Sequence, residues 1–369
     1  MNPTQFGAPS RRNFLATTLG ATAASAVASA ATRQWQLGLN TYCLRFQRWN
    51  DRQLLDYTQS QKLDSMFLQD TQDPRAQDPA HWKEVGEWIR AAQMRIETGG
   101  SAILPASPAE GEEILATLRR NIERAKVMGS PIVRALVASD RYSMPPGPVE
   151  QHMETVIRLL RRVRSQVMDA GLKIGLENHK ELHAFQTRTV IETAGKEFVG
   201  SYLDTGNPVF VCEDPLTTIE ELGPYAVSFH LRDSVVYNHP DGVAIQWVPL
   251  GEGTNDFRQL IARAAELMGP QVHIYCKPIT ARPAVVLPIY NDEFWTKWFP
   301  QCRAKDLGRF LALAKRGRPY DQPQVMADLP GVRERYLEAL KVQQLAHMEQ
   351  SLEYAKKTLR LGQRAQSGG

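Results

Sequence analysis

The sequence predicts a (β/α)8 TIM barrel followed by a helical carboxy-terminal extension. Short apolar runs alternate with helix-like stretches, as in a parallel sheet with helical crossovers. Eight such pairs in about 250 residues match the size of a closed barrel. Glu177, Asp204 and His230 each end an apolar run, at intervals of 27 and 26 residues. One βα unit uses about that many residues, and the strand ends of a barrel converge on one mouth.

The predicted strands are apolar runs that enter polar loops. They cover 36–44, 65–70, 95–100, 131–139, 174–179, 201–207, 227–233 and 272–279. Predicted helices, several opened by Pro, Asp or Asn, cover 51–62, 79–93, 110–128, 149–170, 186–196, 215–222 and 255–268. A doubly wound open sheet is the alternative fold. It normally has a glycine-rich first turn, which is absent after Asn40.

Beyond residue 300 the composition changes to long helices that mix charged and apolar residues. They cover 307–316 and 332–361, with a proline-rich break at 319–330. The chain therefore divides into an export signal at 1–31, the barrel at 32–300 and the helical extension at 301–369. The sequence leaves open whether the extension only packs on the barrel or also forms a homo-oligomer interface.

The amino-terminal segment has the layout of a cleavable export signal. Paired arginines, Arg11 and Arg12, precede an alanine-rich run that ends in Ala28-Ser29-Ala30. The arginine pair and the weakly apolar run are typical of twin-arginine signals. We therefore expect a periplasmic or secreted protein. No later window is apolar enough to span a membrane, so no membrane contact is expected after the signal is removed.

The composition excludes several classes of protein. With 43% hydrophobic and 23% charged residues, the chain is globular. The net charge is only +4, and the basic residues are scattered, so nucleic-acid binding is not expected. A small polar ligand fits better. The four cysteines are too few for a disulfide scaffold, and we interpret Cys43 and Cys276, on the first and last strands, as buried apolar residues.

Glu177, Asp204 and His230 together suit a divalent cation. Their carboxylate and imidazole groups are ligands of ions of intermediate hardness, such as Mn²⁺, Co²⁺ or Zn²⁺, with positions left open for substrate oxygens. A cation there would stabilise the enediolate that forms when a proton leaves the carbon next to a carbonyl. Glu177 is placed to act as the base for that step.

Residues 36–300 resemble the xylose-isomerase-like TIM barrels, a group of sugar phosphate isomerases and epimerases that also includes endonuclease IV. The resemblance rests on Gly175-Leu-Glu-Asn-His179, Leu203-Asp-Thr-Gly-Asn207, Phe229-His-Leu-Arg-Asp233, Val248-Pro-Leu-Gly-Glu-Gly253 and Asp292-Glu-Phe-Trp295. It implies a metal held by Glu177, Asp204, His230 and a second glutamate on the last strand. Aligning the Ile279-Thr-Ala-Arg-Pro283 tail puts Lys277 at that fourth position.

Lys277 changes the chemistry that the resemblance implies. In the epimerases of this group two glutamates flank the substrate carbon, and here the second is missing. Lys277 could be a neutral base or a proton donor beside a metal, or its ammonium could replace the metal as the positive charge. An error in the alignment would instead put it on the outer face. We take Glu177 and Lys277 as the candidate catalytic residues.

His179, Asn207, Arg282 and Asn40 are candidate contacts to sugar hydroxyl groups, and Asp70, Glu97 and Asp233 are weaker candidates at strand ends. The leading prediction is an exported sugar isomerase or epimerase that abstracts a proton next to a carbonyl. The alternatives are a 3-keto-glycoside lyase or hydrolase acting by β-elimination, and a carbohydrate-binding barrel without catalysis. Export also disfavours a phosphorylated substrate.

Overall fold

Eight parallel strands close into a barrel in the computed structural model, which describes residues 33–69, 71–327 and 331–366. The strands are β1 Leu37–Asn40, β2 Ser65–Leu68, β3 Arg95–Ala102, β4 Ile132–Leu136, β5 Lys173–Glu177, β6 Val199–Asp204, β7 Ala226–Leu231 and β10 Ile274–Cys276. Each overlaps a predicted strand. β1 pairs with both β2 and β10, which closes the barrel. The (β/α)8 prediction is confirmed.

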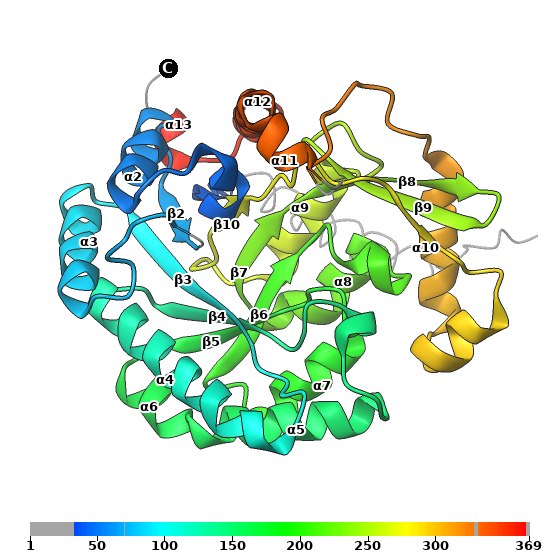
Figure 1. Cartoon of the computed structure of the whole chain (residues 1–369), viewed down its shortest axis with the longest axis horizontal. Coiled ribbons are helices and arrows are strands. Elements are labelled where there is room, and N and C mark those ends of the chain that lie inside the picture. The colour runs from blue at the N-terminus through cyan, green and yellow to red at the C-terminus, as the bar shows by residue number, and fades with distance from the viewer. Residues whose placement is uncertain (1–32, 70, 328–330, 367–369) are drawn as a thin grey trace, which may run out of the picture.

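Helices surround the strands, as Figure 1 shows. They are α2 Asp51–Ser60, α3 Pro79–Ala91, α4 Gly111–Met128, α5 Val149–Arg162, α6 Arg164–Asp169, α7 Ala184–Ala194, α8 Pro215–Leu222 and α9 Phe257–Leu267. Polar side chains begin several of them: Asp78, Asp214 and Asp256 each accept a hydrogen bond from a backbone N–H of the first turn. Among the described residues no helix is both long and apolar enough to cross a membrane.

A hairpin is inserted between β7 and α9, formed by β8 Asp233–His239 and β9 Gly242–Val248. β11 Val285–Leu287, which follows β10 in the chain, pairs with β9 and completes a small antiparallel sheet. Helix α10, Ala304–Arg316, packs on β8, and the two share a second apolar core. Figure 1 shows this unit at one side of the barrel. Sequence reasoning missed the hairpin, although Asp241-Gly242 between two alternating runs is a strong hairpin signal.

The carboxy-terminal helices cover the closing strands of the barrel. They are α11 Val332–Arg335, α12 Leu337–Glu353 and α13 Gln363–Gln366. Gln344 of α12 accepts a hydrogen bond from Phe46 N after β1, at 2.9 Å. Helix α12 also contacts β10, so it lies where a helix following the eighth strand would pack.

The cysteines are free in the structure, and Cys43, Cys212 and Cys276 are buried. Burial raises the pKa of the Cys43 thiol to about 11. These cysteines therefore behave as small apolar residues. The predicted export signal, 1–31, lies outside the described residues.

Candidate active site

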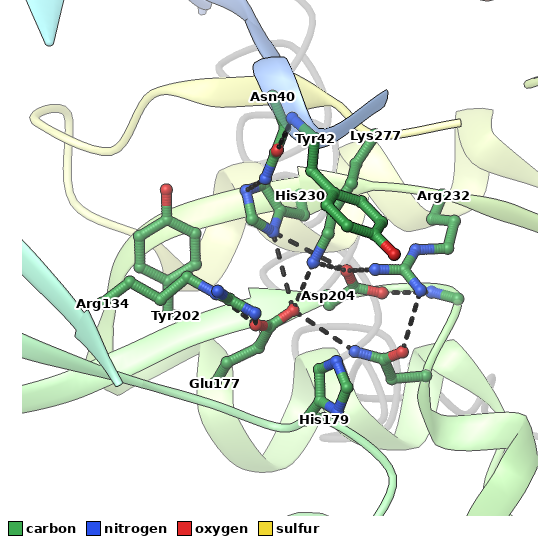
Figure 2. Close-up of polar contacts among 12 residues, drawn as sticks. Asn40, Tyr42, Arg134, Glu177, His179, Tyr202, Asp204, His230, Arg232 and Lys277 are labelled. Atoms are coloured by element: carbon green, nitrogen blue, oxygen red, sulfur yellow. Dashed lines mark hydrogen bonds and ion pairs between the residues drawn. The ribbon is translucent and has the colours of Figure 1, made fainter. Parts of the chain in front are cut away.

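Polar side chains from five neighbouring strands meet inside the barrel mouth (Figure 2). Glu177 ends β5, Asp204 ends β6, and His230 lies near the end of β7. Lys277 follows β10, and Asn40 ends β1. These strands are consecutive in the barrel, in the order β5, β6, β7, β10, β1. The structure therefore brings together the three residues with the regular spacing, and places the lysine among them.

The register of the last strand explains why Lys277 points inward. Tyr275 pairs with His230 across β10 and β7, and Lys277 lies two residues further along, on the same face. Its Nζ atom lies 2.6 Å from Glu177 Oε1 and 3.2 Å from Asp204 Oδ2. The side chain is 4% exposed. Lys277 is therefore inside the barrel and joins the two carboxylates.

Two arginines that sequence reasoning did not single out complete the ion-pair network. Arg134, in the middle of β4, forms a tight ion pair with Glu177 Oε2. Arg232, just after β7, donates from Nη2 to Asp204 Oδ2 at 2.9 Å. Gly206 makes room for this arginine, because a Cβ atom at residue 206 would lie 2.5 Å from Arg232 Cδ. Three cationic side chains thus face two buried carboxylates.

The cations keep both carboxylates ionised. Burial by itself would raise the pKa of Glu177, but the charges of Arg134 and Lys277 outweigh it and hold that pKa well below its usual range. The pKa of Asp204 is lowered in the same way, by Arg232 and Lys277 against the effect of burial. Burial, together with Arg232, lowers the pKa of Lys277, although the two carboxylates oppose this shift. Lys277 therefore gives up its proton more readily than an exposed lysine.

His230 is a neutral imidazole whose proton faces the carboxylates. Burial lowers its pKa. Asn40 Oδ1 accepts a hydrogen bond from Tyr42 N, so Asn40 turns its Nδ2 group toward His230 Nε2, at 3.3 Å. Nε2 is therefore the acceptor and Nδ1 carries the proton. That Nδ1 atom lies 3.7 Å from both Glu177 Oε1 and Asp204 Oδ2.

The four predicted sugar contacts divide into two pairs. His179 and Arg282 line an open cavity above the carboxylates. Burial lowers the pKa of His179 to about 3, so this side chain is neutral at the mouth. Asn40 and Asn207 are 0% and 1% exposed and lie beneath the cavity. Asn207 donates to Glu177 Oε1 at 3.3 Å, so it orients the carboxylate.

The cavity has a volume of about 330 Å³, within the range of about 300–1,000 Å³ usual for small-molecule sites. Its walls combine aromatic, polar and cationic side chains. The lining residues are Tyr42, Gln69, Gly100, Arg134, Leu136, Ser139, His179, Lys180, Arg232, Trp247, Lys277, Ile279 and Arg282. Trp247 comes from β9, so the hairpin that sequence reasoning missed supplies part of the wall.

The weaker candidates have structural contacts. Glu97 accepts a hydrogen bond from Tyr202 Oη at 2.6 Å, inside the barrel. Asp233 accepts from two backbone N–H groups of the loop 251–253, at 2.9 Å each, and so anchors the turn after β9. Asp70 lies outside the described residues. Glu97 and Asp233 therefore have structural roles and are not counted as part of the candidate active site.

Whether a divalent ion fits this network depends on the charges around it. Glu177, Asp204 and His230 each offer a ligand atom, and these atoms lie within 4.8 Å of one another. Lys277, however, already contacts both carboxylates. Like unit charges about 4 Å apart repel by roughly 4 kcal/mol at an effective dielectric constant of about 20. The ligand types suit an ion, but the ion does not fit beside a charged Lys277.

A second group of potential ligands lies outside the barrel mouth. Asp51, Asp73 and His81 also place ligand atoms within 4.8 Å of one another, near the start of α2 and α3. His81 Nε2 lies 2.9 Å from Asp51 Oδ2 and 3.4 Å from Asp73 Oδ2. Any measurement of metal content must therefore distinguish the two groups.

Known proteins resemble the chain in sequence and in structure. Escherichia coli (strain K12) YihM is 21% identical over 161 residues, covering 43% of this chain and 49% of YihM. The chain thus spans about half the length of that relative. The IOLI protein, solved with a bound zinc atom, has a TM-score of 0.55 and 13% identity over 78% of this chain and 100% of its own.

A second solved structure is the E. coli 3-keto-D-glucoside 4-epimerase YcjR. It has a TM-score of 0.52 and 14% identity, and the match covers 73% of this chain and 100% of that one. These two structures share the fold. The family described as xylose isomerase-like TIM barrel matches residues 56–278. That match covers more than half of the sequence, and the chain therefore belongs to the xylose isomerase-like TIM barrel family.

Proposed function

We propose that the protein is an isomerase- or epimerase-like enzyme that removes a proton from the carbon next to a carbonyl group of a sugar or sugar derivative. The observation that carries this proposal is the buried pair of Glu177 and Lys277, 2.6 Å apart at the base of the cavity. Glu177 supplies a base, and Lys277 supplies a positive charge and a proton. Membership of a family whose structural relatives include a sugar epimerase supports a sugar substrate.

Glu177 is the base in this scheme. In the resting site Arg134 and Lys277 stabilise its carboxylate, which makes it a weak base. When the ammonium group of Lys277 turns from Glu177 to a substrate oxygen, the carboxylate loses one cationic partner and its proton affinity rises. The same movement places the ammonium beside the oxyanion that forms as the proton leaves, where its charge stabilises the transition state most.

Lys277 also determines which reactions suit the site. Inversion by two opposed carboxylates needs an acid at the position of Lys277. β-Elimination from a 3-keto-glycoside needs one base, an oxyanion-stabilising charge and a proton donor for the leaving group. Glu177, Arg134 and Lys277 can supply these three parts. Elimination, giving a lyase or hydrolase, is therefore the second candidate reaction, and the relative YcjR is named for a 3-keto-glucoside.

A divalent ion held by Glu177, Asp204 and His230 is the second candidate for the source of positive charge. The grouping of the ligand atoms favours Mn²⁺, Co²⁺ or Zn²⁺, and IOLI is described with zinc. We favour Lys277, because it contacts both carboxylates directly. Metal analysis of the purified protein decides between them. An ion bound in the mouth is lost in His230→Ala and kept in His81→Ala.

Export through the twin-arginine route is part of the proposal. Its support is the arginine pair ahead of an alanine-rich segment. Replacement of Arg11 and Arg12 by lysine is expected to leave unprocessed protein in the cytoplasm. Normal export of that variant would exclude the twin-arginine route.

Exchange of hydrogen for deuterium tests the chemistry directly. In D2O the enzyme is expected to introduce deuterium next to the carbonyl of one member of a panel of ketoses and 3-keto-glycosides, observed by NMR. Glu177→Gln should lower that rate by about 10²- to 10⁴-fold. Glu112→Gln is the control, because Glu112 is 72% exposed and pairs with Arg162 at the surface. Binding of a sugar without any exchange would instead indicate a carbohydrate-binding barrel.

A further inference from the structure

The cavity above Glu177 is lined by cationic side chains. Arg134, Lys180, Arg232, Lys277 and Arg282 all contribute to its wall, and no carboxylate of the described residues does. The two carboxylates of the site lie beneath, with no exposure to solvent. Arg134, Arg232 and Lys277 pair with these carboxylates, whereas Lys180 contacts neither of them.

Lys180 contributes one of the cations of this wall. Among the described residues no carboxylate lies within ion-pair distance of its Nζ atom. That atom lies instead 5.7 Å and 5.6 Å from the ring centres of Phe210 and Trp247. The neighbouring Glu181 turns its carboxylate toward backbone N–H groups instead, from which it accepts hydrogen bonds at 2.7 Å and 3.3 Å. Lys180 thus presents at the cavity a charge that no carboxylate of the described residues contacts.

Arg232 lies against the same aromatic ring. Its guanidinium carbon is 4.6 Å from the ring centre of Trp247. Burial lowers the pKa of Lys180, and so do the positive charges of Arg232 and Arg282, against the opposing effect of Asp140 and Glu181. The charges of Lys180 and Arg232 thus repel each other beside Trp247, and an anion between them would relieve that repulsion.

We propose that the outer part of this cavity binds the oxyanion of an acidic sugar, with Lys180 as its principal contact and Trp247 as the apolar wall beside it. This proposal rests on the proposed function, because it assigns the substrate class of the same site. The anionic group is a carboxylate or a sulfate carried on the sugar, because the proposed export disfavours a phosphate, which is included in the test for comparison. The carbonyl end of the sugar then lies toward Lys277 and Glu177, at the base of the cavity.

Calorimetric titration without turnover tests this assignment. D-glucuronate, D-glucose 6-sulfate and D-glucose 6-phosphate are compared with D-glucose, at low and high ionic strength. We expect at least one acidic sugar to bind about 10- to 100-fold more tightly than D-glucose, with an advantage that shrinks as salt is added. The acidic sugar that binds most tightly identifies the anionic group.

Lys180→Gln is expected to remove most of that preference. Lys173→Gln is the matched control, since Lys173 begins β5, at the opposite end of the barrel, and its replacement changes the net charge equally. Equal affinity of the wild type for D-glucose and all three acidic sugars, or no binding of any acidic sugar, would overturn the proposal. So would a preference that survives in Lys180→Gln. None of these results affects the deuterium-exchange test, so the two proposals can fail separately.

Discussion

Lys277 Nζ lies 2.6 Å from Glu177 Oε1, in the position where the resemblance to sugar isomerases places a metal-binding glutamate. The ammonium group contacts Asp204 as well, at 3.2 Å. A single side chain just after β10 thus compensates part of the charge of two carboxylates, one from β5 and one from β6. The ammonium group of Lys277 therefore supplies a positive charge within the site. The reaction that the site can catalyse depends on the substrate atom toward which this ammonium group turns.

Replacing Lys277 by methionine tests whether this charge is catalytic. Methionine keeps much of the length of the side chain but has no proton and no charge. We expect deuterium exchange into the substrate to fall by about 10²- to 10⁴-fold. The circular dichroism spectrum and the binding of an acidic sugar should persist, because Arg134 and Arg232 still pair with the carboxylates. Wild-type exchange in this variant would show that Lys277 has no chemical role.

Replacing Lys277 by glutamate is expected to convert the network into a metal site. A third carboxylate would then join Glu177, Asp204 and His230, and the competing ammonium would be absent. We expect the metal content of Lys277→Glu to rise to about one ion per chain by elemental analysis, as a site of four ligands requires. Adding His230→Ala should abolish the gain, whereas adding His81→Ala should not. An unchanged metal content would show that charge at residue 277 does not control metal binding.

Replacing Arg134 by leucine is expected to destabilise the fold. The change leaves Glu177 buried with one of its two cations missing, and breaking a buried ion pair costs roughly 3–5 kcal/mol. Urea unfolding measures the loss. Arg162→Leu is the control, because Arg162 pairs with Glu112 at the surface, where both side chains are largely exposed, and such pairs contribute about 0–1 kcal/mol. Equal small losses in both variants would indicate that the Arg134 pair is not important for stability.

Most of the barrel could be predicted from the sequence, because its signals are local. Each of the eight strands is an apolar run of the right length between helix-like stretches, and each was found. The hairpin of β8 and β9 was missed because the segment after Asp233 does not follow the βα repeat. Two runs of alternating apolar and polar residues flank Asp241-Gly242, and this pattern indicates a β-hairpin and not a strand followed by a helix.

The partners in the site depend on strand register, which the sequence does not reveal. Arg134 lies two residues before Leu136, and Leu136 is the register partner of Glu177. The arginine and the carboxylate therefore point into the barrel on the same face of adjacent strands. In the sequence, 43 residues separate them. Spacing could suggest that Glu177, Asp204 and His230 meet, but only the paired strands show which cations neutralise them.

The last prediction concerns the stability of the fold in acid. Burial lowers the pKa of His273 from its usual value of 6.5 to about 3, and the positive charge of Arg95 adds a smaller effect. Below pH 6.5 the unfolded chain takes up a proton that the folded chain binds only near pH 3. Stability from this residue is therefore complete above pH 6.5 and is lost as the pH falls, by up to about 1.4 kcal/mol per pH unit.

In His273→Gln, urea unfolding should show a smaller loss of stability between pH 6.5 and pH 4 than in the wild type. The two curves should run parallel above pH 7, which serves as the internal control. Parallel curves over the whole range would show that His273 takes up its proton equally in the folded and unfolded chains.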